Sequence, residues 1–199
     1  NEDFVNVVIE DNPQVHVVVE GNTFSGGQDD SVNINVQRPS GPAGPEIVAR
    51  IANNQFNTAA ASGSAIEIDL GDSNSDGTVV SITIDGNTIT GSDGDAIVVN
   101  VEGTGTTAIV TLRDNIITSP DGDGIFLDGG STTVGAAANV LVEGNTISGA
   151  ADSGIHVRPF GAAGAASTWN VAVRNNTISA PGVDGIEIDE GEAKALGAR

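Results

Sequence analysis

One segment recurs along the chain, and this repetition constrains the fold more than any other feature. Four clear copies read VHVVVEGNTFSG, VSITIDGNTITG, VLVEGNTISG and VAVRNNTISA, and two weaker copies read IVARIANNQFNT and IVTLRDNIITSP. The copies share one asparagine, at Asn22, Asn54, Asn87, Asn115, Asn145 and Asn176. Successive asparagines are 28 to 33 residues apart. A repeat of this length indicates a stack of similar structural units.

A second short element follows each copy, as in GSAIEIDL, GDAIVVNV, GDGIFLDG, DSGIHVRP and VDGIEIDE. Both elements alternate apolar and polar residues, which is typical of strands with one buried face. This period excludes a helical solenoid, and two clear strands per repeat are too few for a propeller blade. The sequence therefore predicts an all-β chain, a single-domain parallel β-solenoid of about six coils spanning residues 1–199, with few or no helices.

When the repeats are aligned, equivalent positions hold similar residues, which supports the stacking of each residue on its counterpart in the next coil. The residue before each shared asparagine is Gly, Asn or Asp, the types that best tolerate a positive φ. We therefore expect the chain to turn a corner there in a left-handed conformation. The asparagines themselves are expected to form an internal amide ladder, each side chain bonding to the next coil.

The sequence begins and ends at the same point of the repeat, with the second of its two strand elements. DFVNVVIE aligns with DSVNINVQ, so residues 1–12 are expected to form a partial first coil. The last strand is followed by a tail, residues 190–199. No cap is recognisable at either end, although uncovered solenoid ends normally need one. Two interpretations stay open: a piece of a longer repeat protein, or copies of the chain joined end to end.

The charge balance bears on partners and location. There are 27 acids and 7 bases, for a formal net charge of −20, so nucleic-acid binding is not expected. No apolar run reaches membrane-spanning length, so membrane insertion is not expected either. The composition suits a secreted, extracellular or cell-surface protein, and the acids are also explained as a device that keeps a β-rich surface soluble.

The repeated asparagine segments and the strands of DGIEID type resemble those of right-handed parallel β-helix proteins, the pectate-lyase-like superfamily, over about residues 3–191. That superfamily includes polysaccharide lyases, hydrolases and epimerases as well as tailspikes, adhesins and surface fibres, so the resemblance implies a fold and not an activity. Of the polygalacturonase-type motifs, only an Asp-Asp pair, Asp29–Asp30, is present.

A candidate catalytic group lies on the outward side of the second strand. If successive coils stack in register, five residues come together: Asp128, His156, Arg158, Glu187 and Asp189. An acid–base pair beside an arginine could abstract a proton next to an uronate carboxylate. The alternative is a purely structural charge ladder of Asp128, Arg158 and Asp189 on the surface. It is favoured because no aromatic sugar platform surrounds the group: only Phe126 is near, and the only tryptophan, Trp169, is expected at the end of a loop.

A candidate metal site arises from two equivalent turns, SDGDAI and PDGDGI. They place four carboxylates, Asp93, Asp95, Asp121 and Asp123, at matching positions in adjacent coils. Oxygen ligands of this kind suit calcium, although Asp and Gly are also ordinary turn residues. Calcium is therefore a possible cofactor, and no other cofactor is indicated.

Two functions remain open from the sequence. The first is a non-catalytic extracellular structural protein, a filament subunit or a stalk or adhesin segment, with copies of itself as partners. The second is a polysaccharide-active lyase or epimerase, or a glycan-binding β-helix.

Overall fold

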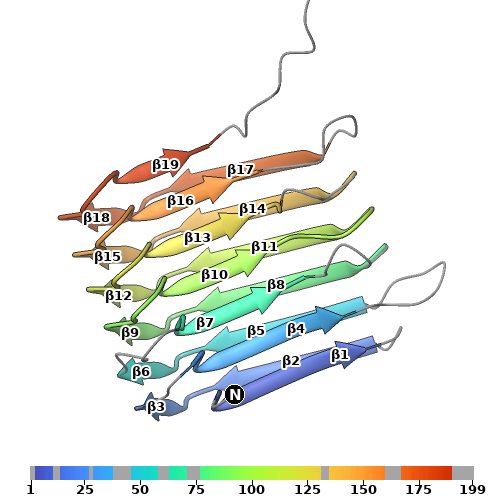
Figure 1. Cartoon of the computed structure of the whole chain (residues 1–199), viewed down its shortest axis with the longest axis horizontal. Helices are drawn as coiled ribbons and strands as arrows, with labels where there is room; N and C mark the ends of the chain where they lie inside the picture. The colour runs from blue at the N-terminus through green and yellow to red at the C-terminus, as the bar shows by residue number, and fades with distance from the viewer. Residues whose placement is uncertain are drawn as a thin grey trace, which may run out of the picture.

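The computed structural model describes residues 3–10, 14–26, 29–37, 46–57, 63–70, 77–130, 135–159 and 167–189. These residues form nineteen strands in three parallel sheets and contain no helix. The strands stack as successive coils of a solenoid, each coil adding one strand to each sheet (Figure 1). In the described part of the chain, no helix has the length and apolar character to cross a membrane.

Sheet A contains seven strands, sheets B and C six each. The strands of sheet A are β1 (Val5–Glu10), β4 (Val32–Gln37), β7 (Ile66–Asp69), β10 (Ile97–Asn100), β13 (Ile125–Asp128), β16 (Ile155–Arg158) and β19 (Ile186–Ile188). Those of sheet B are β2 (Gln14–Glu20), β5 (Glu46–Ala52), β8 (Val79–Asp85), β11 (Thr107–Arg113), β14 (Ala137–Glu143) and β17 (Thr168–Arg174). Those of sheet C are β3 (Thr23–Ser25), β6 (Gln55–Asn57), β9 (Thr88–Thr90), β12 (Ile116–Thr118), β15 (Thr146–Ser148) and β18 (Thr177–Ser179).

The predicted register is confirmed. Val5 pairs with Val32 at the start of sheet A, as expected for a partial first coil, and Ile155 pairs with Ile186 near its other end. Each coil adds a third strand to the two that the sequence showed clearly, because the segment after each shared asparagine forms a short strand of its own. The expected tail, residues 190–199, lies outside the described residues.

The interior is mainly aliphatic. Inward columns of Val, Ile and Leu fill it, and most of these side chains are fully buried. Phe24 and Phe56 stack in the first coils with ring centroids 5.0 Å apart. Trp169 was expected at a loop's end, but it lies within β17 and packs against the core. Each buried aliphatic side chain stabilises the fold by about 1.5–3 kcal/mol, so the stacked columns supply the main driving force.

The shared asparagines form the predicted ladder. From Asn22 through Asn145, each donates its backbone N–H and one side-chain N–H to the side-chain oxygen of the asparagine in the next coil, at 2.9–3.1 Å. The second Nδ2 hydrogen of Asn115 reaches the carbonyl of Ile84 in the preceding coil. Buried amides thus satisfy one another, and six coils are fixed in one register.

The corner before each asparagine has the expected left-handed backbone. The six residues have φ between 53° and 70°, namely Gly21, Asn53, Gly86, Asp114, Gly144 and Asn175. A second left-handed corner, four residues after the asparagine, was not predicted. It is occupied by Gly26, Gly91, Ser119, Gly149 and Ala180. The signal was weak because Ser and Ala are not typical of positive φ.

A charged column runs along sheet B beside the asparagine corner. It contains four residues in register on adjacent strands, Asp85, Arg113, Glu143 and Arg174. Arg113 lies 3.7 Å from Asp85, and Arg174 lies 3.0 Å from Glu143. Arg50 was not foreseen in this role: it stands one outward position earlier and bridges Glu20 and Asp85. Opposite charges across coils therefore favour the observed register.

Candidate functional site

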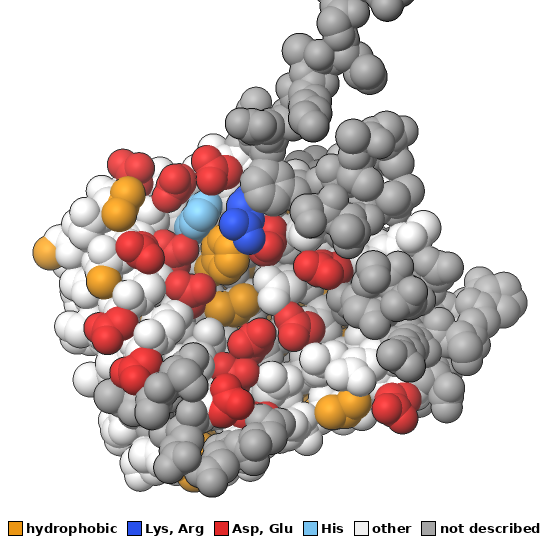
Figure 2. Space-filling model, viewed as in Figure 1, with side chains coloured by type: hydrophobic (Ala, Val, Ile, Leu, Met, Phe, Trp, Pro, Cys, Tyr) orange, Lys and Arg blue, Asp and Glu red, His pale blue; other side chains and the backbone are white. Residues whose placement is uncertain are grey.

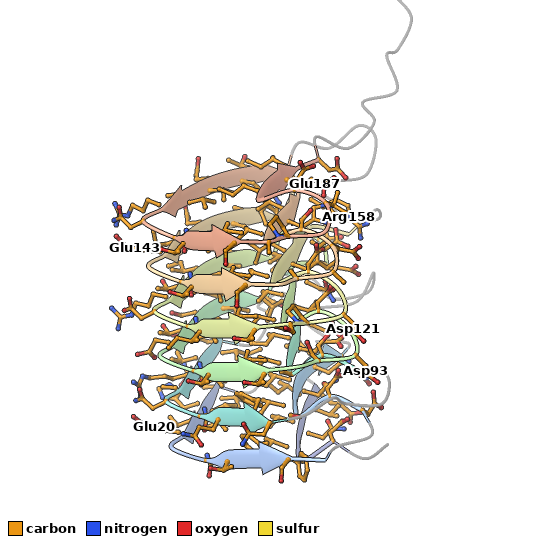
Figure 3. The ribbon with its side chains drawn as sticks, turned by 90° about the vertical axis from the view of Figure 1, so that its left-hand side faces the viewer. Glu20, Asp93, Asp121, Glu143, Arg158 and Glu187 are labelled. Atoms are coloured by element: carbon orange, nitrogen blue, oxygen red, sulfur yellow. The ribbon has the colours of Figure 1, made fainter. Side chains whose placement is uncertain are left out.

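The outer face of sheet A carries the candidate catalytic residues. Its first outward column contains Glu67, Val98, Phe126, His156 and Glu187 in register. Figure 2, which looks at this side, shows a histidine and a basic side chain close together among many acidic ones. Figure 3 shows Arg158 and Glu187 on one side of the rod, opposite Glu20 and Glu143.

Arg158 and Asp128 form a two-pronged ion pair between β16 and β13. The Nε and Nη2 atoms of Arg158 lie 3.1 and 2.5 Å from the two carboxylate oxygens of Asp128. The guanidinium also lies over the ring of Phe126, 4.8 Å from its centroid. The hydrogen bond to Asp128 is the largest cause that raises the pKa of Arg158. Asp128 and Phe126, both on the neighbouring strand of sheet A, therefore fix the position of the guanidinium.

His156 lies between two carboxylates. Its Nδ1 is 3.1 Å from Oδ2 of Asp123, and its Nε2 is 3.5 Å from Oδ2 of Asp189. Its ring packs at an angle against Phe126, with centroids 4.9 Å apart. The predicted group is therefore brought together, but as two subsets: Asp128 with Arg158, and His156 with Asp189 and Glu187.

Glu187 completes the second subset from β19. One of its carboxylate oxygens accepts a hydrogen bond from the Ser153 hydroxyl at 2.8 Å. The liganding atoms of His156, Glu187 and Asp189 all lie within 4.8 Å of one another. Asp189 is the most exposed member, with 53% of its side chain accessible. Of the three side chains, those of His156 and Glu187 are partly buried against the rod, and that of Asp189 faces the solvent.

The predicted calcium residues lie at the corner before sheet A, in equivalent positions of adjacent coils. Oδ1 of Asp95 accepts the backbone N–H of Asp123 at 2.6 Å, and Oδ1 of Asp123 accepts that of Ser153 at 2.7 Å. Asp30 does the same for Ser64. This corner therefore has its own ladder, in which Asp and Ser residues accept amide hydrogens from the next coil. Burial raises the pKa of both Asp95 and Asp123.

Asp93 and Asp121, the outer pair of the same prediction, lie on adjacent coils at one edge of the rod (Figure 3). Among the described residues, two sets bring three liganding atoms within 4.8 Å of one another, and neither contains Asp93 or Asp121. Calcium binding at this corner therefore stays a prediction.

A separate acidic group lies at the other end of the same face. Asp3, Asp29 and Asp30 bring their carboxylates within 4.8 Å of one another. Glu67 lies beside them, and its pKa rises to about 8, mainly through burial and then through the charge of Asp30 and a hydrogen bond with it. Asp69 accepts a hydrogen bond from Asn100 at 2.5 Å, yet burial still raises its pKa.

Sequence reasoning missed two residues that contact the group of His156, Glu187 and Asp189. Asp123 had been assigned to calcium alone, although its second oxygen meets His156 of the next coil. Ser153 had no role, although it occupies the column of Asp95 and Asp123. Column alignment could have found Ser153. The contact between Asp123 and His156 depends on a side-chain rotamer that spans two coils, which no alignment shows.

The comparisons with known proteins agree with this architecture. The family model of the right handed beta helix region matches residues 72–196, more than half of the chain. No curated protein and no solved structure gives a significant match. The three-sheet coil, the stacked asparagines and the family match lead to one conclusion: the chain belongs to the right-handed β-helix family.

Proposed function

We propose that the chain is a non-catalytic structural segment, a rigid β-helix rod that serves as a filament subunit or as part of a stalk or adhesin outside the cell. The observation that carries the proposal is that the polar side chains of the candidate catalytic face contact one another across coils. Arg158 holds Asp128, His156 contacts Asp123, and Glu187 accepts from Ser153. Side chains engaged in this way stiffen the rod.

The continuity of the coil-to-coil ladders supports the same role. The asparagine ladder, the Asp/Ser corner ladder and the charged column each join successive coils. A rod whose coils are hydrogen-bonded to one another at several corners resists bending and slippage of register. This property suits a stalk or spacer.

Assembly of copies through the solenoid ends is part of this proposal. At the C-terminal end, the inward-column residues Ile186 and Ile188 have 49% and 57% of their surface accessible. The described residues form six coils of three strands and one additional strand, which belongs to sheet A. A copy stacked directly in register would therefore put β1 above β19 and leave sheets B and C one strand short at the junction. Continuous stacking thus needs two further strands or the displacement of β1.

Electron microscopy and light scattering of the purified chain test the assembly. We expect end-to-end particles or filaments, and Ile188→Lys should abolish them because it places a charge on the end face. Ile109→Lys is the matched control, since Ile109 is 54% exposed on the outer side of a central strand. Monomers under all conditions, or equal loss in both variants, would contradict assembly through the ends.

A polysaccharide-active role is the second candidate. It is favoured by one observation, that an acid, a histidine and an arginine lie on one outer face around an aromatic ring. The test is incubation with uronate polymers, followed by detection of unsaturated products for a lyase and of inverted uronates for an epimerase. Product formed by the chain and lost in His156→Asn and Arg158→Met would replace the structural proposal.

A further inference from the structure

We propose that His156, Glu187 and Asp189 form a binding site for a divalent transition-metal ion, with Zn²⁺ as its prototype. The three side chains come from β16 and from the end of the next sheet A strand, β19. One imidazole nitrogen and two carboxylates are a ligand set that zinc takes in proteins. The ion would tie together the last two described coils.

The first argument is the state of the histidine ring. Nδ1 lies 3.1 Å from Oδ2 of Asp123, a geometry that fits a hydrogen on Nδ1 donated to that carboxylate. In the neutral ring, the free electron pair is then on Nε2. A carboxylate that holds the far nitrogen of a histidine in this way is the usual outer partner of a metal ligand.

The second argument is that Nε2 forms no hydrogen bond in the described part of the chain, since Oδ2 of Asp189, which pairs with it only when the ring is charged, is 3.5 Å away. Nε2 is buried, and among the described residues no group forms a hydrogen bond with it. The side chain as a whole is only 16% exposed. A buried nitrogen acceptor without a partner is unfavourable unless something else occupies its electron pair. The atoms in front of it are the carboxylate oxygens of Glu187 and Asp189, which cannot donate a hydrogen bond while ionised.

The third argument is distance. Nε2 and Oδ2 of Asp189 are 3.5 Å apart, which is long for a hydrogen bond. Two ligands held tetrahedrally at about 2.0–2.2 Å from zinc are separated by about 3.3–3.6 Å. The third ligand atom, from Glu187, lies within 4.8 Å of the other two, and the proposed site requires it to move closer by rotation of the Glu187 side chain. Three protein ligands leave a fourth position for water or a donor from another molecule.

The surrounding charges favour a cation. Glu187 and Asp189 face the histidine, Asp123 stands behind it, and the nearby Arg158 has both prongs on Asp128. The nitrogen ligand distinguishes this site from the all-carboxylate corner of Asp93 and Asp121, because imidazole suits zinc and carboxylates alone suit calcium.

Titration of the whole chain with ZnCl₂, by calorimetry in a buffer that does not bind zinc, tests the proposal. We expect one ion per chain, and millimolar Ca²⁺ should not displace it. The chain has two histidines, His16 and His156, so nitrogen-15 spectra resolve both rings. Zinc should shift the ring signals of His156 and leave those of His16 in place. Shifts in neither ring, or in both alike, would overturn the proposal.

Variants separate binding from folding. His156→Asn keeps a donor for Asp123 and removes Nε2, and Asp189→Asn alters an exposed side chain. Each should weaken zinc binding at least tenfold while the chain stays folded. Glu46→Gln removes one carboxylate from an exposed position of sheet B and should leave the affinity unchanged. Equal affinity in the His156→Asn variant, or equal weakening by Glu46→Gln, would show that zinc binds nonspecifically to the acidic surface.

Discussion

The side-chain oxygen of Asn115 accepts two hydrogen bonds from Asn87, one from its backbone N–H and one from its Nδ2, both at 3.0 Å. Asn115 is fully buried and repeats the arrangement toward Asn145. Because every interior member is both donor and acceptor, the loss of one side chain leaves partners unsatisfied in both neighbouring coils.

Asn115→Ala should therefore be among the most damaging single substitutions. Each buried polar group left without a partner costs about 1–3 kcal/mol, so the free energy of unfolding should fall by about 3 kcal/mol or more. Asn22→Ala, at the exposed first position of the ladder, should lower it by less than about 1 kcal/mol. Urea unfolding of both variants measures the difference. Equal losses would mean that the ladder does not hold the coils together.

The second left-handed corner offers a stabilising substitution. Ala180 has a φ of 50°, where an L residue is disfavoured by about 1–2 kcal/mol. Ala180→Gly removes this strain but adds entropy to the unfolded chain, so a net gain of about 0.5–1 kcal/mol is expected. Gly149→Ala, at the same position one coil earlier, should destabilise by a similar amount. Thermal melts of the two variants should move in opposite directions, and a lower melting temperature for Ala180→Gly would contradict the assignment of strain.

The Arg158–Asp128 pair should show strong coupling. Asp128 is largely buried, so Arg158→Met leaves a poorly solvated carboxylate and should cost about 1–3 kcal/mol. Asp128→Asn combined with Arg158→Met removes both charges and should recover much of that loss. A double-mutant cycle of unfolding free energies measures the coupling. Strict additivity would show that the two side chains act independently.

Glu67 should make the fold less stable as the pH rises. Its pKa in the folded chain is about 8, above the ordinary value of 4.5, mainly because it is buried and close to Asp30. The folded state therefore holds this proton more tightly than the unfolded state. Its stabilising contribution is complete below about pH 4.5 and is lost as the pH rises through about 8.

Melting temperatures between pH 5 and 8.5 measure this effect. Glu67→Gln should flatten the decline, because the amide does not ionise. Glu46→Gln, an exposed acid on sheet B, is the control and should leave the slope unchanged. An identical slope in the variant and the parent would contradict the role of Glu67.

Calcium at the Asp93–Asp121 corner is tested by thermal melts with CaCl₂ and then with a chelator. If the four predicted acids hold the ion, calcium should raise the melting temperature, the chelator should reverse the rise, and Asp93→Asn with Asp121→Asn should abolish it. Asp95 and Asp123 should not be changed in this test, because each accepts a backbone amide from the next coil. An unchanged melting temperature in the parent would remove the calcium prediction.

Much of the fold could be read from columns of like residues. The shared asparagines, the left-handed residue before them and the inward Ile and Val columns all occupy the predicted places. These features depend on the period of the repeat and on backbone preferences that each residue type carries with it. The second left-handed corner escaped notice because Ser119 and Ala180 adopt a conformation that neither favours by itself.

The candidate site could be predicted only in part. In-register stacking was enough to bring His156, Arg158 and Asp128 onto one face. The charge ladder predicted from that stacking is confirmed for Arg158 and Asp128. Stacking could not show that Asp123 reaches His156, or that Nε2 of His156 is left facing Glu187 and Asp189. Those outcomes depend on rotamers chosen among neighbours from three coils.

The sequence by itself determined the coil, its register and the residues of its aliphatic interior, because a repeat of about 30 residues places each side chain above its own counterpart. Only the tertiary structure decided which polar side chains form hydrogen bonds and which buried atoms of the described residues, such as Nε2 of His156, form none. The physical reason is that register follows from backbone spacing, whereas the pairing of long polar side chains follows from small differences in burial, charge and reach between coils.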